Sequence, residues 1–80
     1  MNKNILKDWL FNGYEFCEDL DLEAQLLANE MELSEYKATH LKRLMKAWIN
    51  NEDNQRIKIQ TSSLVSQNAL VDEFIQSFGI

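Results

Sequence analysis

The chain has 80 residues, of which 45% are hydrophobic and 26% charged, and its formal net charge at pH 7 is −5. This length allows one hydrophobic core, and the hydrophobic content excludes a disordered, charge-dominated tail. Cys17 is the only cysteine, which excludes an internal disulfide framework and makes a cytoplasmic location the expectation. No apolar run approaches the roughly 20 residues of a membrane span, and a signal-peptide pattern is absent, so we expect no membrane partner.

The first predicted helix lies near residues 3–11. Its apolar residues recur at helical spacing behind Asn2 or Asn4 as a candidate N-cap, and Asn12-Gly13 ends the pattern with residues that tolerate a positive φ. Residues 14–20 fit either an extended segment or an irregular turn, and the pattern does not decide between them.

Two further helices are predicted in the middle of the chain. Asp21 is the candidate N-cap of the first, which runs to about Met31 and has Leu26, Leu27 and Met31 on its apolar side. Ser34 is the candidate N-cap of the second. The core-facing residues of this second helix share one face, and they are Ala38, Leu41, Leu44 and Met45.

A β-hairpin is predicted over about residues 47–60. Trp48-Ile49 supplies one short strand, residues 50–55 are all polar, and the segment Arg56–Gln60 alternates with the period of two that is typical of a strand.

A C-terminal helix is predicted over about residues 63–78, with Ser62 or Ser63 as its N-cap and Gly79 at its end. Its large apolar residues form one stripe, which consists of Leu64, Val71, Phe74, Ile75 and Phe78. Such a stripe needs a partner surface, either on the rest of the chain or on a second copy, and we expect a homodimer through this helix.

The middle of the chain resembles the helix-turn-helix superfamily of DNA-binding proteins. The residues at matching positions are Leu27, Ala28, Met31, Leu33, Ser34, Ala38, Leu41 and Leu44. The segment Leu41-Lys42-Arg43-Leu44 is similar to the end of the recognition helix in winged-helix regulators, and the match covers about residues 22–60. Glu32 departs from it, because this turn position is usually glycine and the residue there must adopt a left-handed conformation at a cost of about 1 kcal/mol.

The resemblance implies a mainly α, winged-helix-like single domain. Its three-helix core would contain a helix-turn-helix at about 22–46, followed by a wing at about 47–60 and the C-terminal helix. It also implies a DNA-binding surface on the third helix and the wing, formed by Ser34, Tyr36, Lys37, Thr39, His40, Lys42, Arg43, Lys46, Arg56 and Lys58. Arg43 and Lys37 suit guanine edges or phosphates, and the wing residues would contact the DNA backbone. The alternative is that these bases merely form the solvated face of a surface helix.

The acidic residues support a competing hypothesis. Eight acids and no base lie between Glu15 and Glu35. A compact acidic domain can imitate nucleic acid and occupy the channel of a host nucleic-acid-binding protein, as small inhibitors from phages and other mobile elements do. The residues that would bind such a partner are Glu15, Glu18, Asp19, Asp21, Glu23 and Glu30. The alternative is that the acids serve solubility alone.

The chain lacks the combinations of residues that catalytic sites and metal sites require. The chain has one histidine and one cysteine, which excludes a structural zinc site, and it has no glycine-rich phosphate loop. We therefore expect no cofactor, no metal and no enzymatic activity. The sequence favours a small, dimeric, sequence-specific transcriptional regulator that binds double-stranded DNA, and an acidic protein-binding inhibitor or adaptor is the alternative.

Overall fold

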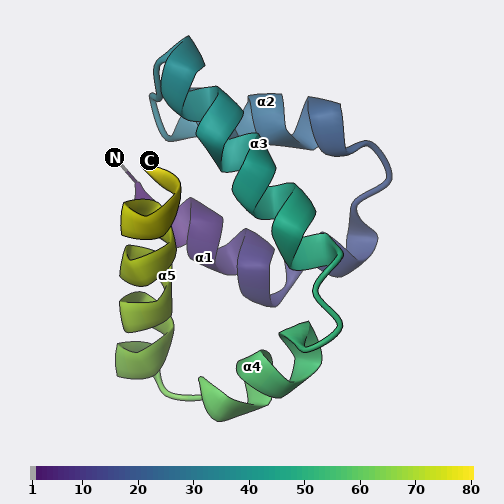
Figure 1. Ribbon diagram of the computed structural model, residues 1–80, viewed down its shortest axis with the longest axis vertical. Coiled ribbons are helices and arrows are strands. Elements are labelled where there is room, and N and C mark those ends of the chain that lie inside the picture. The colour runs from purple at the N-terminus through teal and green to yellow at the C-terminus, as the bar shows by residue number, and fades with distance from the viewer. Residues whose placement is uncertain (1) are drawn as a thin grey trace.

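The computed structural model describes residues 2–80, and its secondary structure is mainly α-helical (Figure 1). In chain order the elements are α1 (Lys3–Phe11), the 3₁₀ helix η1 (Gly13–Phe16), α2 (Leu20–Glu30), α3 (Glu35–Ile49), α4 (Asn54–Gln60) and α5 (Leu64–Phe78). In Figure 1, α1 lies centrally below the crossed pair α2 and α3, α5 runs along one side, and α4 lies at the bottom. Among the described residues, no helix has the length and apolar content that crossing a membrane requires.

Four of the helices begin at a side chain that caps the backbone. Asn2, Asp19, Ser34 and Ser63 accept hydrogen bonds from free N–H groups in the first turns of α1, α2, α3 and α5. The predictions for Ser34 and for the first helix are thereby confirmed. The prediction of Asp21 as a cap is wrong, because α2 begins two residues earlier and Asp19 Oδ1 accepts from the Leu22 N–H at 3.2 Å.

The turn between α2 and α3 is a tight helix C-cap. The Leu33 N–H donates to the Ala28 carbonyl at 3.0 Å and the Glu32 N–H to the Asn29 carbonyl at 3.1 Å, which is the pattern of a Schellman motif. Glu32 adopts the left-handed conformation expected at this position, with φ of 57°. A non-glycine residue therefore carries the backbone strain of this turn.

The core lies between α1, α2, α3 and α5, and Trp48 is at its centre. The indole Nε1 of Trp48 donates to the Leu10 carbonyl at 2.8 Å, so that a buried donor satisfies a carbonyl near the end of α1. The rings of Tyr14 and Phe74 meet Trp48 edge-on, with centroids 6.0 and 5.7 Å away. The other large, fully buried side chains are Leu6, Leu10, Met31, Leu41, Leu44, Met45 and Val71.

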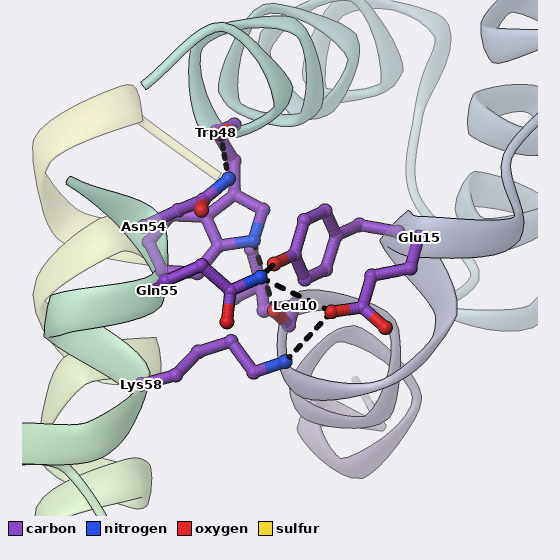
Figure 2. Close-up of polar contacts among 7 residues, drawn as sticks. Leu10, Glu15, Trp48, Asn54, Gln55 and Lys58 are labelled. Carbon is purple, nitrogen blue, oxygen red and sulfur yellow. Dashed lines mark hydrogen bonds and ion pairs between the residues drawn. The ribbon is translucent and has the colours of Figure 1, made fainter. Parts of the chain in front are cut away.

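The predicted wing is wrong, because no strand occurs in residues 2–80. α3 continues through Trp48 and Ile49, and the alternating segment forms α4. Contacts at helical spacing explain this: Asn54 is buried and its Nδ2 donates to the Trp48 carbonyl at 3.2 Å, Ile57 packs on the core, and Lys58 reaches Glu15. Figure 2 shows these polar contacts between α4, α3 and η1.

The prediction of one buried apolar stripe on the C-terminal helix is only partly correct. Ser63 caps α5 and Gly79 ends it with φ of 72°, as predicted. Val71 is buried and Phe74, Ile75 and Phe78 pack against the core of the same chain. Leu64 is 61% exposed, because the first turn of α5 extends beyond the core.

Candidate interaction surfaces

An open groove of about 470 Å³ follows one side of α2 and is the first candidate site. We call it the acidic groove, and it is lined by Phe16, Glu18, Asp19, Leu22, Glu23, Leu26, Leu27 and Glu30. Three of its apolar side chains face solvent: Phe16 is 80% exposed, and Leu22 and Leu26 are each 53% exposed. Carboxylates therefore surround an apolar surface that the chain itself leaves uncovered.

Helical spacing places the two leucines together. Leu22 and Leu26 are four residues apart and so occupy adjacent turns on one side of α2. Ala24 and Ala28 also lie one turn apart, but on the buried side. The prediction that Leu26 lies on the buried side of this helix is wrong. Leu22 and Phe16 were not among the predicted binding residues.

The 3₁₀ helix η1, which carries Phe16, is held by side chains of α4. Gln55 Nε2 donates to the Tyr14 hydroxyl at 2.6 Å and to Glu15 Oε1 at 3.2 Å, and Lys58 Nζ lies 3.4 Å from the same carboxylate oxygen (Figure 2). The hydrogen bond from Gln55, and then the ammonium group of Lys58, hold the pKa of Glu15 below its ordinary value. Glu15 is thus directed toward α4 and does not line the groove.

The carboxylates of the acidic groove differ in their roles. Glu23 Oε1 accepts a hydrogen bond from Trp9 Nε1 at 2.8 Å, and Asp19 caps α2. Within residues 2–80, Glu18 and Glu30 form no ion pair and no side-chain hydrogen bond. Since Glu18 precedes α2 and Glu30 is its last residue, carboxylates without a structural role stand at the two ends of the groove.

Asp21 belongs to a different surface, a cleft of about 320 Å³ between α2 and α3 that is lined by both polar and apolar side chains. Its carboxylate forms an ion pair with Lys42 of α3, and this lysine lowers the pKa of Asp21. Gln25, Asn29 and Thr39 also line the cleft. Lys42, predicted to contact DNA, is therefore engaged within the protein.

The other residues predicted to bind DNA are spread over two helices. Arg56 and Lys58 belong to α4 and not to a wing, and they form ion pairs with Asp53 and Glu15. Among the residues predicted to bind DNA, Ser34 at the cap of α3 and Tyr36, Lys37, Thr39, Arg43 and Lys46 on α3 are also exposed. No acidic side chain of residues 2–80 lies within ion-pair distance of Lys37, Arg43 or Lys46.

His40 is partly buried beside Tyr36, with ring centroids 4.5 Å apart. Its Nδ1 is buried and has no hydrogen-bond partner in the described residues. This ring therefore faces the protein more than it faces solvent.

Cys17 does not have the environment of a reactive thiol. Burial, followed by the carboxylates of Glu23 and Asp19, raises the pKa of Cys17 to about 11. The thiolate, which is the nucleophilic form, is thus rare at neutral pH. Among residues 2–80, no three histidine, cysteine or acidic side chains are grouped so that they could hold a metal ion.

No protein-family model, curated protein or solved structure matches the chain.

Proposed function

We propose that this protein is a protein-binding adaptor or inhibitor that acts through the acidic groove. The observation that supports the proposal is the pair Leu22 and Leu26, which are half exposed in a groove whose two ends carry Glu18 and Glu30. Exposed apolar side chains inside a polar rim are the usual composition of a protein interface. Because each leucine is about half exposed, its burial by a partner would contribute about 1 kcal/mol to binding, roughly half of the value for a fully exposed leucine.

The charge of the protein supports a basic partner. The formal net charge is −5, and an acidic rim attracts basic surfaces and repels phosphate. A nucleic-acid-binding protein has such a basic surface, because it must neutralise phosphates with lysine and arginine. The proposed partner is therefore a protein of this class.

Capture of partners by two matched double variants tests the proposal. One variant removes the carboxylates at the ends of the groove (Glu18→Gln and Glu30→Gln), and the other removes exposed charges of α3 (Arg43→Gln and Lys46→Gln). The wild-type protein and both variants are immobilised and exposed to nuclease-treated lysate of the producing cells, and bound proteins are quantified. We expect a stoichiometric partner that is depleted by the groove variant and retained by the α3 variant. Equal recovery by wild type and groove variant would contradict the proposal.

DNA recognition by α3 is the second candidate function. The resemblance to a helix-turn-helix supports it, as do the order of α2, turn and α3 and the cap at Ser34. The exposed bases Lys37, Arg43 and Lys46, which have no acidic partner within residues 2–80, are the specific observation in its favour. If α3 enters a major groove, Arg43→Ala should weaken binding to a selected site by about 1–3 kcal/mol and relax the preference at one base pair. Failure to enrich any duplex from a randomised pool at low salt would exclude this candidate.

A further inference from the structure

We infer that the acidic groove binds an amphipathic helix that carries apolar residues at helical spacing and basic residues near both ends. The inference rests on the proposed function and specifies the segment of the partner that would be bound. It follows from three properties of the groove: the line of its apolar side chains, its length, and the positions of its unengaged carboxylates.

The exposed leucines form a seam suited to a second helix. Leu22 and Leu26 lie on adjacent turns of α2, and Phe16 of η1 adds a further exposed apolar group to the groove. Side chains that repeat every three to four residues leave gaps between them, and the ridges of an approaching helix fill such gaps. An amphipathic helix with apolar residues at i, i+3, i+4 and i+7 presents the matching ridge.

The length of the groove and its charges specify the rest of the segment. α2 has 11 residues and is thus about 16 Å long, so a segment of about 12–14 helical residues spans it. Glu18 and Glu30 stand at opposite ends of this length, and each is open to a cation because neither has a partner within residues 2–80. Lysine or arginine near each end of the segment would meet these carboxylates.

A second copy of the chain does not fit the groove in a symmetric arrangement. A two-fold axis through the groove would bring the carboxylates at the ends of one groove, those of Glu18 and Glu30, close to the end carboxylates of the other. Repulsion between these like charges disfavours such a dimer. A nucleic acid does not fit either, because its phosphates would meet the same carboxylates. An apolar and basic protein segment satisfies both the leucines and the acids.

The probe for the experiment is a synthetic amphipathic peptide of about 14 residues. It carries leucine at i, i+3, i+4, i+7 and i+11 and lysine at its ends. Three control peptides each change one property: a scramble has the same composition without the seam, a second has glutamate in place of lysine, and a third has two central prolines that prevent a helix. Binding is measured by fluorescence anisotropy and by the amide shifts of the isotope-labelled protein at two salt concentrations.

We expect the amphipathic basic peptide to bind, with shifts centred on Leu22 and Leu26, and each control peptide to bind at least about tenfold more weakly. Leu22→Gln with Leu26→Gln should lower its affinity about tenfold or more, whereas Leu64→Gln with Val65→Gln, at exposed apolar positions of α5, should leave it unchanged. Glu18→Gln with Glu30→Gln should lower the affinity about fivefold at low salt and less at high salt. Circular dichroism and thermal melting verify that each variant is folded.

Equal binding of the scramble, of the acidic peptide or of the proline peptide would overturn the inference, as would an equal loss of affinity in the α5 control variant. The two proposals can fail separately. If a cellular partner depends on the groove but the amphipathic peptide does not bind, the helical segment is wrong and the function stands. If the peptide binds but no cellular partner depends on the groove, the segment preference is supported and the proposed function is wrong.

Discussion

The C-terminal ends of α2 and α5 have the same hydrogen-bond pattern, but the residue with a positive φ is glutamate in one and glycine in the other. Placing glycine at the first and alanine at the second should change the stability of the protein in opposite directions. At the end of α2, Glu32 has φ of 57°, and at the end of α5, Gly79 has φ of 72°. The Ile80 N–H donates to the Ile75 carbonyl at 2.9 Å, just as the Leu33 N–H donates to the Ala28 carbonyl at 3.0 Å. The variants are Glu32→Gly and Gly79→Ala.

The magnitudes follow from the backbone. A left-handed conformation costs a residue with a Cβ about 1–2 kcal/mol relative to glycine. Glycine at the same position loses about 0.5–1 kcal/mol more conformational freedom on folding. Glu32→Gly should therefore raise the free energy of unfolding by about 0.5–1 kcal/mol, and Gly79→Ala should lower it by a similar amount. A Cβ on Gly79 would lie 3.7 Å from His40 Nδ1, an ordinary contact, so no steric penalty is added.

Urea unfolding followed by tryptophan fluorescence measures both changes. A change of 1 kcal/mol corresponds to a shift of about 4–8 °C in the melting temperature of a domain of this size, so thermal melting is an independent check. A lower stability for Glu32→Gly, or an unchanged stability for Gly79→Ala, would refute the assignment of strain to these two turns.

Three further predictions concern the core, the thiol and an ion pair. Trp48→Phe removes the donor to the buried Leu10 carbonyl and should lower the free energy of unfolding by about 2–4 kcal/mol in urea; an unchanged value would contradict the importance of that bond. Alkylation of Cys17 by iodoacetamide should be slow at neutral pH and continue to accelerate up to about pH 11, whereas a plateau in the native protein near pH 9 would argue against the effect of partial burial and of the carboxylates of Glu23 and Asp19 on this thiol. Lys42→Gln should raise the pKa of Asp21 in a carboxyl NMR titration. Because the folded-state pKa of Asp21 is lowered, its small stabilisation is present at neutral pH, is lost as the pH falls through that pKa, and weakens with salt; an unmoved titration would disprove the pairing.

Helices that are specified by the spacing of nearby apolar residues and by a capping side chain could be predicted from the sequence. The apolar spacing of residues 3–11 and the caps Ser34 and Ser63 depend on neighbouring residues only, and the structure agrees with them. The prediction that α2 begins at Asp21 was wrong, because Asp19 and Asp21 are both residue types that can cap a helix and the local pattern does not distinguish them. Asp19 is the cap in the structure, and the residue after it, Leu20, packs against the core.

α4 could not be predicted from local pattern. Five alternating residues are compatible with a strand, and the contacts that favour a helix come from distant parts of the chain. Lys58 contacts Glu15, which lies 43 residues earlier in the chain, and Gln55 donates to Tyr14, which lies 41 residues earlier. Tertiary contacts thus determine the conformation of this segment.

Most acidic side chains of the groove could be named from the sequence, but its exposed apolar side chains could not. Four of the six acids predicted to bind a protein partner line the groove, namely Glu18, Asp19, Glu23 and Glu30, whereas Glu15 and Asp21 pair with lysines of α4 and α3. The exposed leucines were missed because apolar residues in a helix are first assigned to the core. One indication was present: α2 carries apolar residues at more positions than a single buried face can hold.

Photo-cross-linking in the producing cells tests the role of the acidic groove most directly. A photoreactive phenylalanine analogue replaces Leu26 in the groove or, as the control, Leu64 on α5, which is similarly exposed. We predict one discrete cross-linked protein from position 26, its loss when Glu18 and Glu30 are changed to glutamine, and no such product from position 64. The same products from both positions, or none from position 26, would contradict the claim that the groove is the surface through which this protein acts.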